Sequence, residues 1–199
     1  MGPREVSLAA IMTAATAALT MLLMIPFPLT RGYFNVGDGM VMLSGLLLGP
    51  WIGFFAGGVG SGLADVLLGY GHVAPATFLI KGTEGFLVGL IGYNRSFRYR
   101  LLGCIAGAIA MLAGYFSYQV PMYGIGPALG ELTTVNPGQV IMGAIISLIL
   151  YQIVLKAYPA ITTYVPRPVS RTKAVLFIVI VAVILSSMIG YYATVGYLW

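Results

Sequence analysis

Four ionisable side chains interrupt apolar stretches of this 199-residue chain. Asp38 begins one stretch and Asp65 lies near the end of the next. Lys81 and Glu84 lie near the start of a third stretch and share a helix face, so they can pair with each other, with Asp65 or with a ligand. An ionisable group inside a bilayer costs about 2.5 kcal/mol or more. The cluster is therefore either a structural ion-pair network or the charged part of a pocket that opens to the outside.

Amides and phenols are expected on the same side of the membrane, in and next to the connections 26–38 and 121–137. Apolar and aromatic walls with a few orienting polar groups are typical of small-molecule sites. Any one of these tyrosines, taken alone, also fits the aromatic belt of a membrane interface. Together with the ionisable cluster they form the predicted substrate-binding set: Asn35, Asp38, Asp65, Lys81, Glu84, Tyr118, Gln119, Tyr123, Asn136 and Gln139.

The composition requires these side chains to be positioned by membrane helices. Apolar residues make up 59% of the chain and charged residues 8%, against about 25% charged in soluble proteins. Such a chain is solvated mainly by lipid, which excludes an ordinary soluble domain. We expect an all-α polytopic membrane protein with seven spans, at 6–26, 39–56, 57–71, 77–93, 102–120, 137–157 and 173–196. The second and third spans have no polar linker between them, and the turn is expected near Gly57 and Gly58.

Small residues recur at helical spacing in two places. Glycines every four residues from Gly45 to Gly57 predict a flat face for close helix packing. Pro50, in the same stretch, is expected to kink that helix. Ala10, Ala14 and Ala18 make a second stripe in the first span, and spacing alone favours packing within the chain.

The distribution of basic residues predicts the orientation, because cytoplasmic loops retain Lys and Arg. With the N-terminus inside, the inner side holds eight of the ten basic residues: Arg4, Arg95, Arg98, Arg100, Lys156, Arg167, Arg171 and Lys173. Seven spans then place Trp199 and the C-terminus outside. The basic residues are interpreted first as topology signals, so no nucleic-acid partner is expected despite the formal charge of +5.

The sequence offers little for catalysis or metal binding. Cys104 is the single cysteine and is expected to be a small buried residue. His72 is the single histidine; one imidazole makes no convincing metal site, and loop capping or a ligand contact remain its alternatives. A phosphate-binding loop, a metalloprotease motif and a nucleophile elbow are all missing from the sequence. We expect no cofactor, no metal and no enzymatic activity.

Three segments together resemble a known family. They are 33–38 (YFNVGD), 47–50 (LLGP) with the glycine-rich 57–65, and 81–86 (KGTEGF). In this order and spacing they are similar to the substrate-binding S components of energy-coupling factor (ECF) vitamin importers, and within those to the riboflavin-type group. The resemblance covers about residues 6–157.

The resemblance implies a six-helix substrate-binding core at 1–157. The chain departs from the family in its seventh apolar stretch, which predicts a cytoplasmic connection at 158–172 and an additional membrane helix at 173–199. The resemblance also implies capture from outside of a vitamin or precursor, riboflavin-like or hydroxymethylpyrimidine/thiamine-like, across the cell membrane of a prokaryote. The partners it implies are a transmembrane T component, which the stripe Ala10, Ala14 and Ala18 would meet, and two ABC-type ATPases. S components are thought to topple in the membrane, and the connection 26–37 is the candidate lid.

Two other classes of function remain open from the sequence. An autonomous secondary transporter or channel for a small polar solute would use Asp65, Lys81 and Glu84 as ion or proton relays. An intramembrane enzyme acting on lipid would use Asp38, Asp65 or His72 as acid, base or metal ligand.

Overall fold

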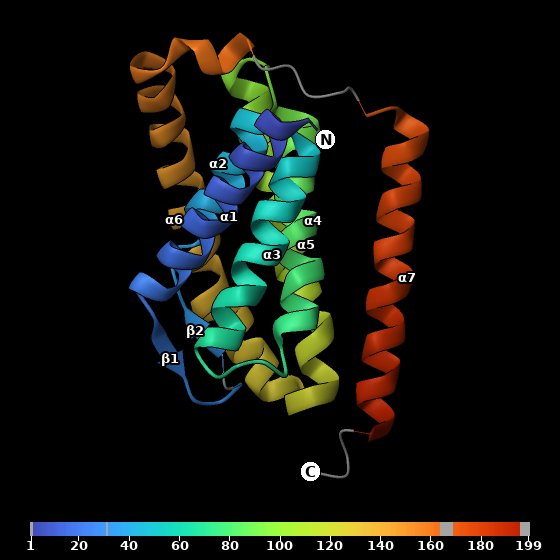
Figure 1. Ribbon diagram of the computed structural model, residues 1–199. Helices are drawn as coiled ribbons and strands as arrows, with labels where there is room; N and C mark the ends of the chain where they lie inside the picture. The colour runs from blue at the N-terminus through green and yellow to red at the C-terminus, as the bar shows by residue number, and fades with distance from the viewer. Residues whose placement is uncertain (1, 31, 164–168, 196–199) are drawn as a thin grey trace.

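The computed structural model describes residues 2–30, 32–163 and 169–195, and it confirms an all-α polytopic membrane protein. Six helices, α1 to α6, form a bundle, and α7 lies beside it (Figure 1). The helices are α1 Pro3–Leu22, α2 Asp38–Leu48, α3 Pro50–Leu67, α4 Ala74–Gly92, α5 Phe97–Tyr123, α6 Ile125–Ala157 and α7 Arg171–Val195, with a short 3₁₀ helix at Pro159–Thr163.

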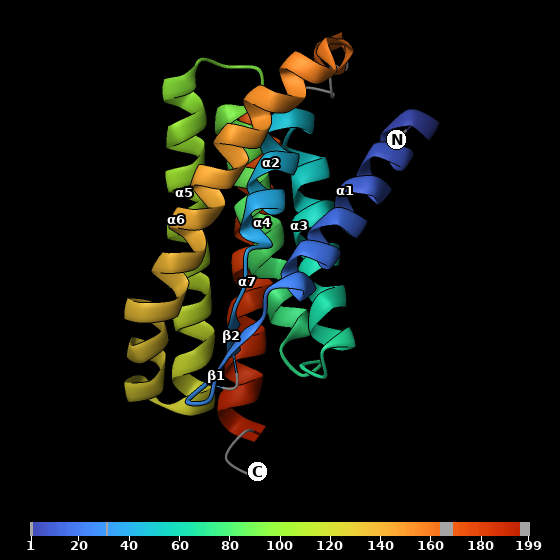
Figure 2. The ribbon, with the colours of Figure 1, turned by 90° about the vertical axis from the view of Figure 1, so that its left-hand side faces the viewer.

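Helix α4 lies at the centre of the bundle. It packs against α2, α3 and α5 and also contacts α7, and most of its residues are buried. Helix α1 lies against α3 at the edge of the bundle, and its N-terminal half leans away from the other helices (Figure 2). Among the described residues, five helices are long and apolar enough to cross a membrane: α1, α4, α5, α6 and α7. Helix α2 is buried along its whole length of 11 residues, about 16 Å, which is shorter than a hydrocarbon core.

The predicted turn at Gly57 and Gly58 is wrong, because α3 runs through both residues. The break between α2 and α3 lies at Gly49, whose φ of +87° is strained for residues with a side chain. Pro50 therefore does not kink a helix; it occupies the first turn of α3, where its missing N–H costs no hydrogen bond. The predicted spans 39–56 and 57–71 correspond to α2 and α3, with the boundary between them at Gly49.

Gly53 and Gly57 lie inside α3, and close backbone contacts explain why these positions carry glycine. A Cβ atom on Gly53 would lie 2.4 Å from the carbonyl oxygen of Gly85, and one on Gly57 would lie 2.5 Å from that of Lys81. Gly45 meets the same Gly85 carbonyl from α2. The glycine stripe is thus a packing surface for α4, as its spacing predicts, although it is divided between two helices.

The connection 121–137 is helical, contrary to the sequence interpretation. Helix α5 continues to Tyr123, and α6 starts at Ile125. Gly124, with a φ of +86°, makes the whole turn. Pro121 lies in the last turn of α5 and Pro137 lies inside α6. A membrane helix tolerates such prolines because neighbouring groups can satisfy the freed carbonyl.

A two-stranded antiparallel hairpin joins α1 to α2, where the sequence indicated only a connection. Its strands are β1 Ile25–Phe27 and β2 Gly32–Phe34, with Ile25 opposite Phe34. The hairpin lies at the same end of the bundle as the turns α3–α4 and α5–α6 (Figure 1).

The opposite end of the bundle carries the described basic residues other than Lys81. Arg4 lies at the start of α1, the arginines from Arg95 to Arg100 lie around the α4–α5 turn, and Lys156 lies in the last turn of α6. Figure 1 shows the N-terminus, this turn and the start of α7 at one end. The separation of charge along the bundle is the one that the sequence predicts. Arg31, Arg167 and Trp199, which were also assigned to a side, lie outside the described residues.

Aromatic contacts join helix α7 to the bundle at two places. The ring of Phe177 lies 4.4 Å from that of Phe86, 5.0 Å from Phe54 and 5.1 Å from Trp51, measured between centroids. Near its other end, the ring of Tyr192 packs edge-on against Tyr118 at 5.8 Å. Most of the rest of α7 is exposed, as expected for a helix that faces lipid.

Candidate functional site: a polar pocket at the hairpin end

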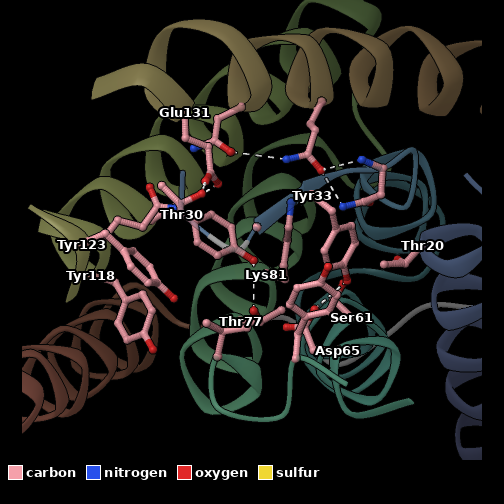
Figure 3. A pocket seen from close by; sticks show the side chains of 18 residues that line it. Thr20, Thr30, Tyr33, Ser61, Asp65, Thr77, Lys81, Tyr118, Tyr123 and Glu131 are labelled. Carbon is pink, nitrogen blue, oxygen red and sulfur yellow. Dashed lines mark hydrogen bonds between the residues drawn. The ribbon is translucent and has the colours of Figure 1, made fainter. Parts of the chain in front are cut away.

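A pocket opens beneath the hairpin between α1, α3, α4, α5 and α6 (Figure 3). Its empty volume, with the open mouth included, is about 560 Å³. Tyr118 and Tyr123 lie on one side, Thr20 on the other, and Lys81 between them (Figure 3).

Eight of the ten predicted substrate-binding residues line this pocket: Asn35, Asp65, Lys81, Tyr118, Gln119, Tyr123, Asn136 and Gln139. Asp38 and Glu84 are not among the lining residues; both contact Lys81, which is one of them. The sequence interpretation missed the other lining residues as members of the set: Thr20, Thr30, Gly32, Tyr33, Ser61, Tyr70, Val73, Thr77, Tyr115 and Glu131. The feature of the sequence that could have identified Thr20, Ser61 and Thr77 was a hydroxyl group near the outer end of a mostly apolar helix.

Lys81 is held by two carboxylates from two helices. Its ammonium group donates to Asp38, at the start of α2, and lies 3.4 Å from Glu84 Oε2, one turn along α4. All three side chains are almost completely buried. A buried charge is tolerated only when it is paired, so this triad fixes α2 against α4 below the pocket. The sequence also left Asp65 open as a partner of Lys81, but Lys81 pairs with Asp38 and Glu84 instead.

Asp65 pairs instead with the hairpin. The hydroxyl of Tyr33, in β2, donates a 2.6 Å hydrogen bond to Asp65 Oδ1. Burial, reinforced by the nearby Asp65 carboxylate, raises the pKa of Tyr33 above its ordinary value. Tyr33 therefore remains protonated, and a hydrogen-bond donor, at every physiological pH.

Two further contacts fasten the connection between α1 and α2 over the pocket. Thr30, in the hairpin turn, donates to the Glu131 carboxylate of α6. The backbone N–H of Asn35 donates to Gln139 Oε1 at 3.1 Å, and the Asn35 side-chain amide donates to the same oxygen. The hairpin side of the pocket is thus joined to α3 and to two points of α6.

Hydrogen bonds among the lining amides fix their orientation. Gln119 Nε2 donates to Glu131 Oε1 at 2.7 Å, which leaves Gln119 Oε1 without a hydrogen-bond partner. Gln139 Nε2 donates to Asn136 Oδ1 at 3.3 Å, which leaves Asn136 Nδ2 without one. The Tyr118 hydroxyl and Asp65 Oδ2 are also unpartnered among the described residues. Buried polar atoms are normally satisfied, so these four atoms are candidates for contact with a ligand.

The remaining single residues lie apart from the triad. His72 Nε2 lies 3.3 Å from the hydroxyl of Tyr123, at an exposed position near the pocket mouth. Cys104 is buried near Ser147, with a sulfur–oxygen distance of 3.9 Å, and the prediction of a small buried residue is confirmed. In the part of the chain that the structure describes, no three His, Cys, Asp or Glu residues gather as metal ligands.

Comparison with known sequences agrees with this arrangement. Residues 2–157 match the sequence profile of the family described as "ECF-type riboflavin transporter, S component". The chain belongs to this family. Helix α7 lies beyond the matched residues, so the S-component profile covers the bundle α1–α6 and the pocket.

Two curated relatives are similar over much of their length. The thiamine precursor transporter HmpT of Lactococcus lactis subsp. cremoris (strain MG1363) is 30% identical over 148 residues, which are 74% of this chain and 85% of HmpT. A Pyrococcus woesei protein described as an "uncharacterized protein in gap 3' region" is 48% identical over 118 residues, 59% of this chain and 79% of that protein.

The alanine stripe of this S component faces away from its own bundle. Ala10, Ala14 and Ala18 are all exposed on α1. The opposite face of α1 packs on α3, where a Cβ atom on Gly60 would lie 2.7 Å from Cβ of Thr16. Spacing alone favoured packing of this stripe within the chain. The structure contradicts that prediction, because the stripe is exposed.

Proposed function

We propose that this chain is the substrate-capturing subunit of an ATP-driven ECF importer and binds a vitamin or vitamin precursor from outside the cell. The observation that carries the proposal is the polar pocket at the end of the bundle opposite the basic residues. The S-component family and the HmpT relative support it. Binding and transport need no covalent chemistry from this chain.

Within this proposal the lining residues have distinct roles. Asn35, Gln119, Asn136 and Gln139 supply hydrogen bonds, and Tyr118 and Tyr123 supply aromatic faces for stacking. Asp65 and Lys81 supply charge at the wall of the pocket. Asp38 and Glu84 act through Lys81, whose ammonium group they hold in place.

The partners in this proposal are a transmembrane T component and two ABC-type ATPases. The exposed stripe Ala10, Ala14 and Ala18 is the surface for the T component, because small side chains let another helix approach closely. The ATPases would supply the energy, since this sequence contains no phosphate-binding loop.

We place the protein in the cell membrane of a prokaryote, with the N-terminus and the basic end in the cytoplasm. In this arrangement the hairpin and the pocket face outward. Helix α7 is then an additional span beyond the core 1–157, and the C-terminus lies outside.

The direct test is binding by the purified full chain. We expect a copurified small molecule, identified by mass spectrometry, or saturable binding of one compound from a vitamin panel. Lys81→Ala and Glu84→Gln are expected to weaken that binding, and unchanged affinity in both variants would remove the charged triad from the site.

Uptake assays separate an ECF subunit from an autonomous carrier. We expect uptake into proteoliposomes only when the T component, the ATPases and ATP are all present. Uptake by this chain alone, driven by a pH gradient, would contradict the proposal and establish a secondary transporter.

A further inference from the structure

Helix α7 contacts a residue of the substrate pocket. The ring of Tyr192, near the end of α7, lies edge-on against the ring of Tyr118, with centroids 5.8 Å apart and ring planes at 89°. Tyr118 lines the pocket from α5. The matched S-component profile ends at residue 157, so Tyr192 lies outside the six-helix core. Helix α7 therefore adds a side chain to the surroundings of the site that the core does not supply.

The orientation of the Tyr118 ring depends on packing and not on a hydrogen bond. Tyr118 is 1% exposed, and its hydroxyl has no hydrogen-bond partner among the described residues. It lies beside Tyr123 at one side of the pocket (Figure 3). A buried ring without a hydrogen bond is held by the shape of its neighbours, and aromatic pairs prefer the edge-to-face arrangement that Tyr192 makes here.

The second half of α7 presents one face to the region of Tyr118. Leu185, Met188 and Tyr192 recur at spacings of three and four residues, which places them on the same side of the helix. All three pack against the buried cluster that contains Tyr118. A cleft between α7 and the helices α4 and α5 lies along 178–185, between this face and the aromatic contacts of Phe177. The contact with Tyr118 is thus separate from the aromatic cluster in the first half of α7.

A tyrosine near the end of a membrane helix also fits the aromatic belt at the lipid headgroups. That role depends on the hydroxyl, whereas the contact with Tyr118 depends on the ring. Of the two adjacent tyrosines on α7, Tyr191 is 61% exposed and suits the belt, while Tyr192 is half-buried and contacts the bundle. The two roles can be separated by a substitution that removes only the hydroxyl.

We propose that Tyr192 is a positioning residue of the substrate site, which holds the ring of Tyr118 in the orientation that stacks on a ligand. Tyr192 does not line the pocket itself, so it acts through Tyr118. This inference rests on the proposed function, in which Tyr118 supplies an aromatic face, and it extends the site to α7.

The first test needs no ligand. A 3-fluorotyrosine introduced at position 118 of the full chain, in lipid nanodiscs, reports the state of the ring by ¹⁹F NMR. We expect Tyr192→Ala to broaden or split the resonance, because the ring gains a second orientation, and Tyr192→Phe to keep one sharp resonance. Val183→Ala, at an exposed position of the same helix, is the control and should also keep it. One sharp resonance in Tyr192→Ala would overturn the inference.

The second test measures affinity by calorimetry with four probes: riboflavin, thiamine, 4-amino-5-hydroxymethyl-2-methylpyrimidine and biotin. For each probe that the wild-type chain binds, we expect Tyr192→Ala to bind about 3- to 10-fold more weakly, the range of an edge-to-face aromatic pair. Tyr192→Phe should bind as the wild type does, because it keeps the ring. A Phe variant as weak as the Ala variant would assign the effect to the hydroxyl and overturn the inference.

A double variant shows whether Tyr192 acts through Tyr118. Tyr118→Leu keeps an apolar side chain but removes the ring. In this background Tyr192→Ala should cause no further loss of affinity, because the group that it positions is gone. Additive losses would show that the two residues act independently and would overturn the inference.

The wild-type chain separates the two levels of the argument. If it binds a probe and Tyr192→Ala binds that probe equally well, this inference is overturned and the proposed function stands. If the wild-type chain binds none of the four probes, the proposed function is overturned, and this inference with it.

Discussion

The hydroxyl of Tyr33, in the hairpin, donates a 2.6 Å hydrogen bond to Asp65, near the end of α3. This bond joins the connection between α1 and α2 to the wall of the pocket. It also leaves one carboxylate oxygen of Asp65 open to the cavity. The same contact therefore fastens the hairpin to α3 and orients a carboxylate that lines the pocket.

We expect Tyr33→Phe to loosen the hairpin and weaken ligand binding by about 1.5–3 kcal/mol, the range of a hydrogen bond to a charged group. The ring still packs on Tyr70, so the fold should survive. Calorimetry gives the affinity, and hydrogen exchange of 32–34 reports the loosening. Tyr158→Phe, at an exposed position of the opposite end, should change neither quantity. Unaltered exchange in Tyr33→Phe would contradict a fastening role.

Removing the ammonium group of Lys81 leaves two buried carboxylates without their cation. Breaking a buried ion pair in this way costs about 3–5 kcal/mol. We therefore expect Lys81→Met to lower the melting temperature of the purified protein sharply. The double variant Lys81→Met/Asp38→Asn should recover part of the loss, because one of the stranded charges is gone. A double variant no more stable than the single one would show that repulsion between carboxylates is not the cause.

The close approach of α3 and α4 predicts unequal costs for two chemically identical substitutions. Gly53→Ala places a Cβ atom 2.4 Å from the Gly85 carbonyl oxygen, so α3 must move, at a cost of about 1–3 kcal/mol. Gly126→Ala, in the first turn of α6, meets nothing within 4 Å and should be neutral or slightly stabilising. Thermal unfolding of the two variants measures the difference. Equal melting temperatures would contradict the packing.

The exposed alanine stripe predicts a variant that binds ligand but does not assemble. We expect Ala14→Leu to reduce co-purification with the T component and ATPases at least tenfold, because leucine holds the partner helix away. Its ligand affinity should stay unchanged, since Ala14 lies outside the pocket. Val175→Leu, on the exposed face of α7, is the control for added bulk towards lipid. Normal assembly of Ala14→Leu would exclude the stripe as the docking surface.

The aromatic cluster predicts how α7 is attached. We expect Phe177→Ala to release the first half of α7, since it removes three ring contacts at once. Spin labels on α7 and α4 should report a longer and broader distance distribution, whereas Val179→Ala, at an exposed position, should not. An unchanged distance in Phe177→Ala would assign the attachment to other contacts.

Much of the fold and part of the site followed from local patterns. The glycine spacing predicted tight packing, and the three-residue spacing of Lys81 and Glu84 predicted a shared face; both properties are internal to helices. The break at Gly49 could not be placed by hydropathy, since Gly57 and Gly58 look equally flexible in the sequence. Their role is to let α3 pack closely against α4, and this role depends on the tertiary structure.

The sequence by itself determined that the protein is a bundle of membrane helices with acidic and amide groups gathered towards one end and most of the basic groups at the other. Composition and periodicity are sufficient for that, because they describe each helix alone. Only the tertiary structure decided that Lys81 pairs with Asp38 and Glu84, that Asp65 pairs with Tyr33, and which acceptors remain open. The partners of a buried charge depend on how each helix is rotated against its neighbours. Packing across the bundle sets that rotation, and the spacing of residues along the chain does not predict it.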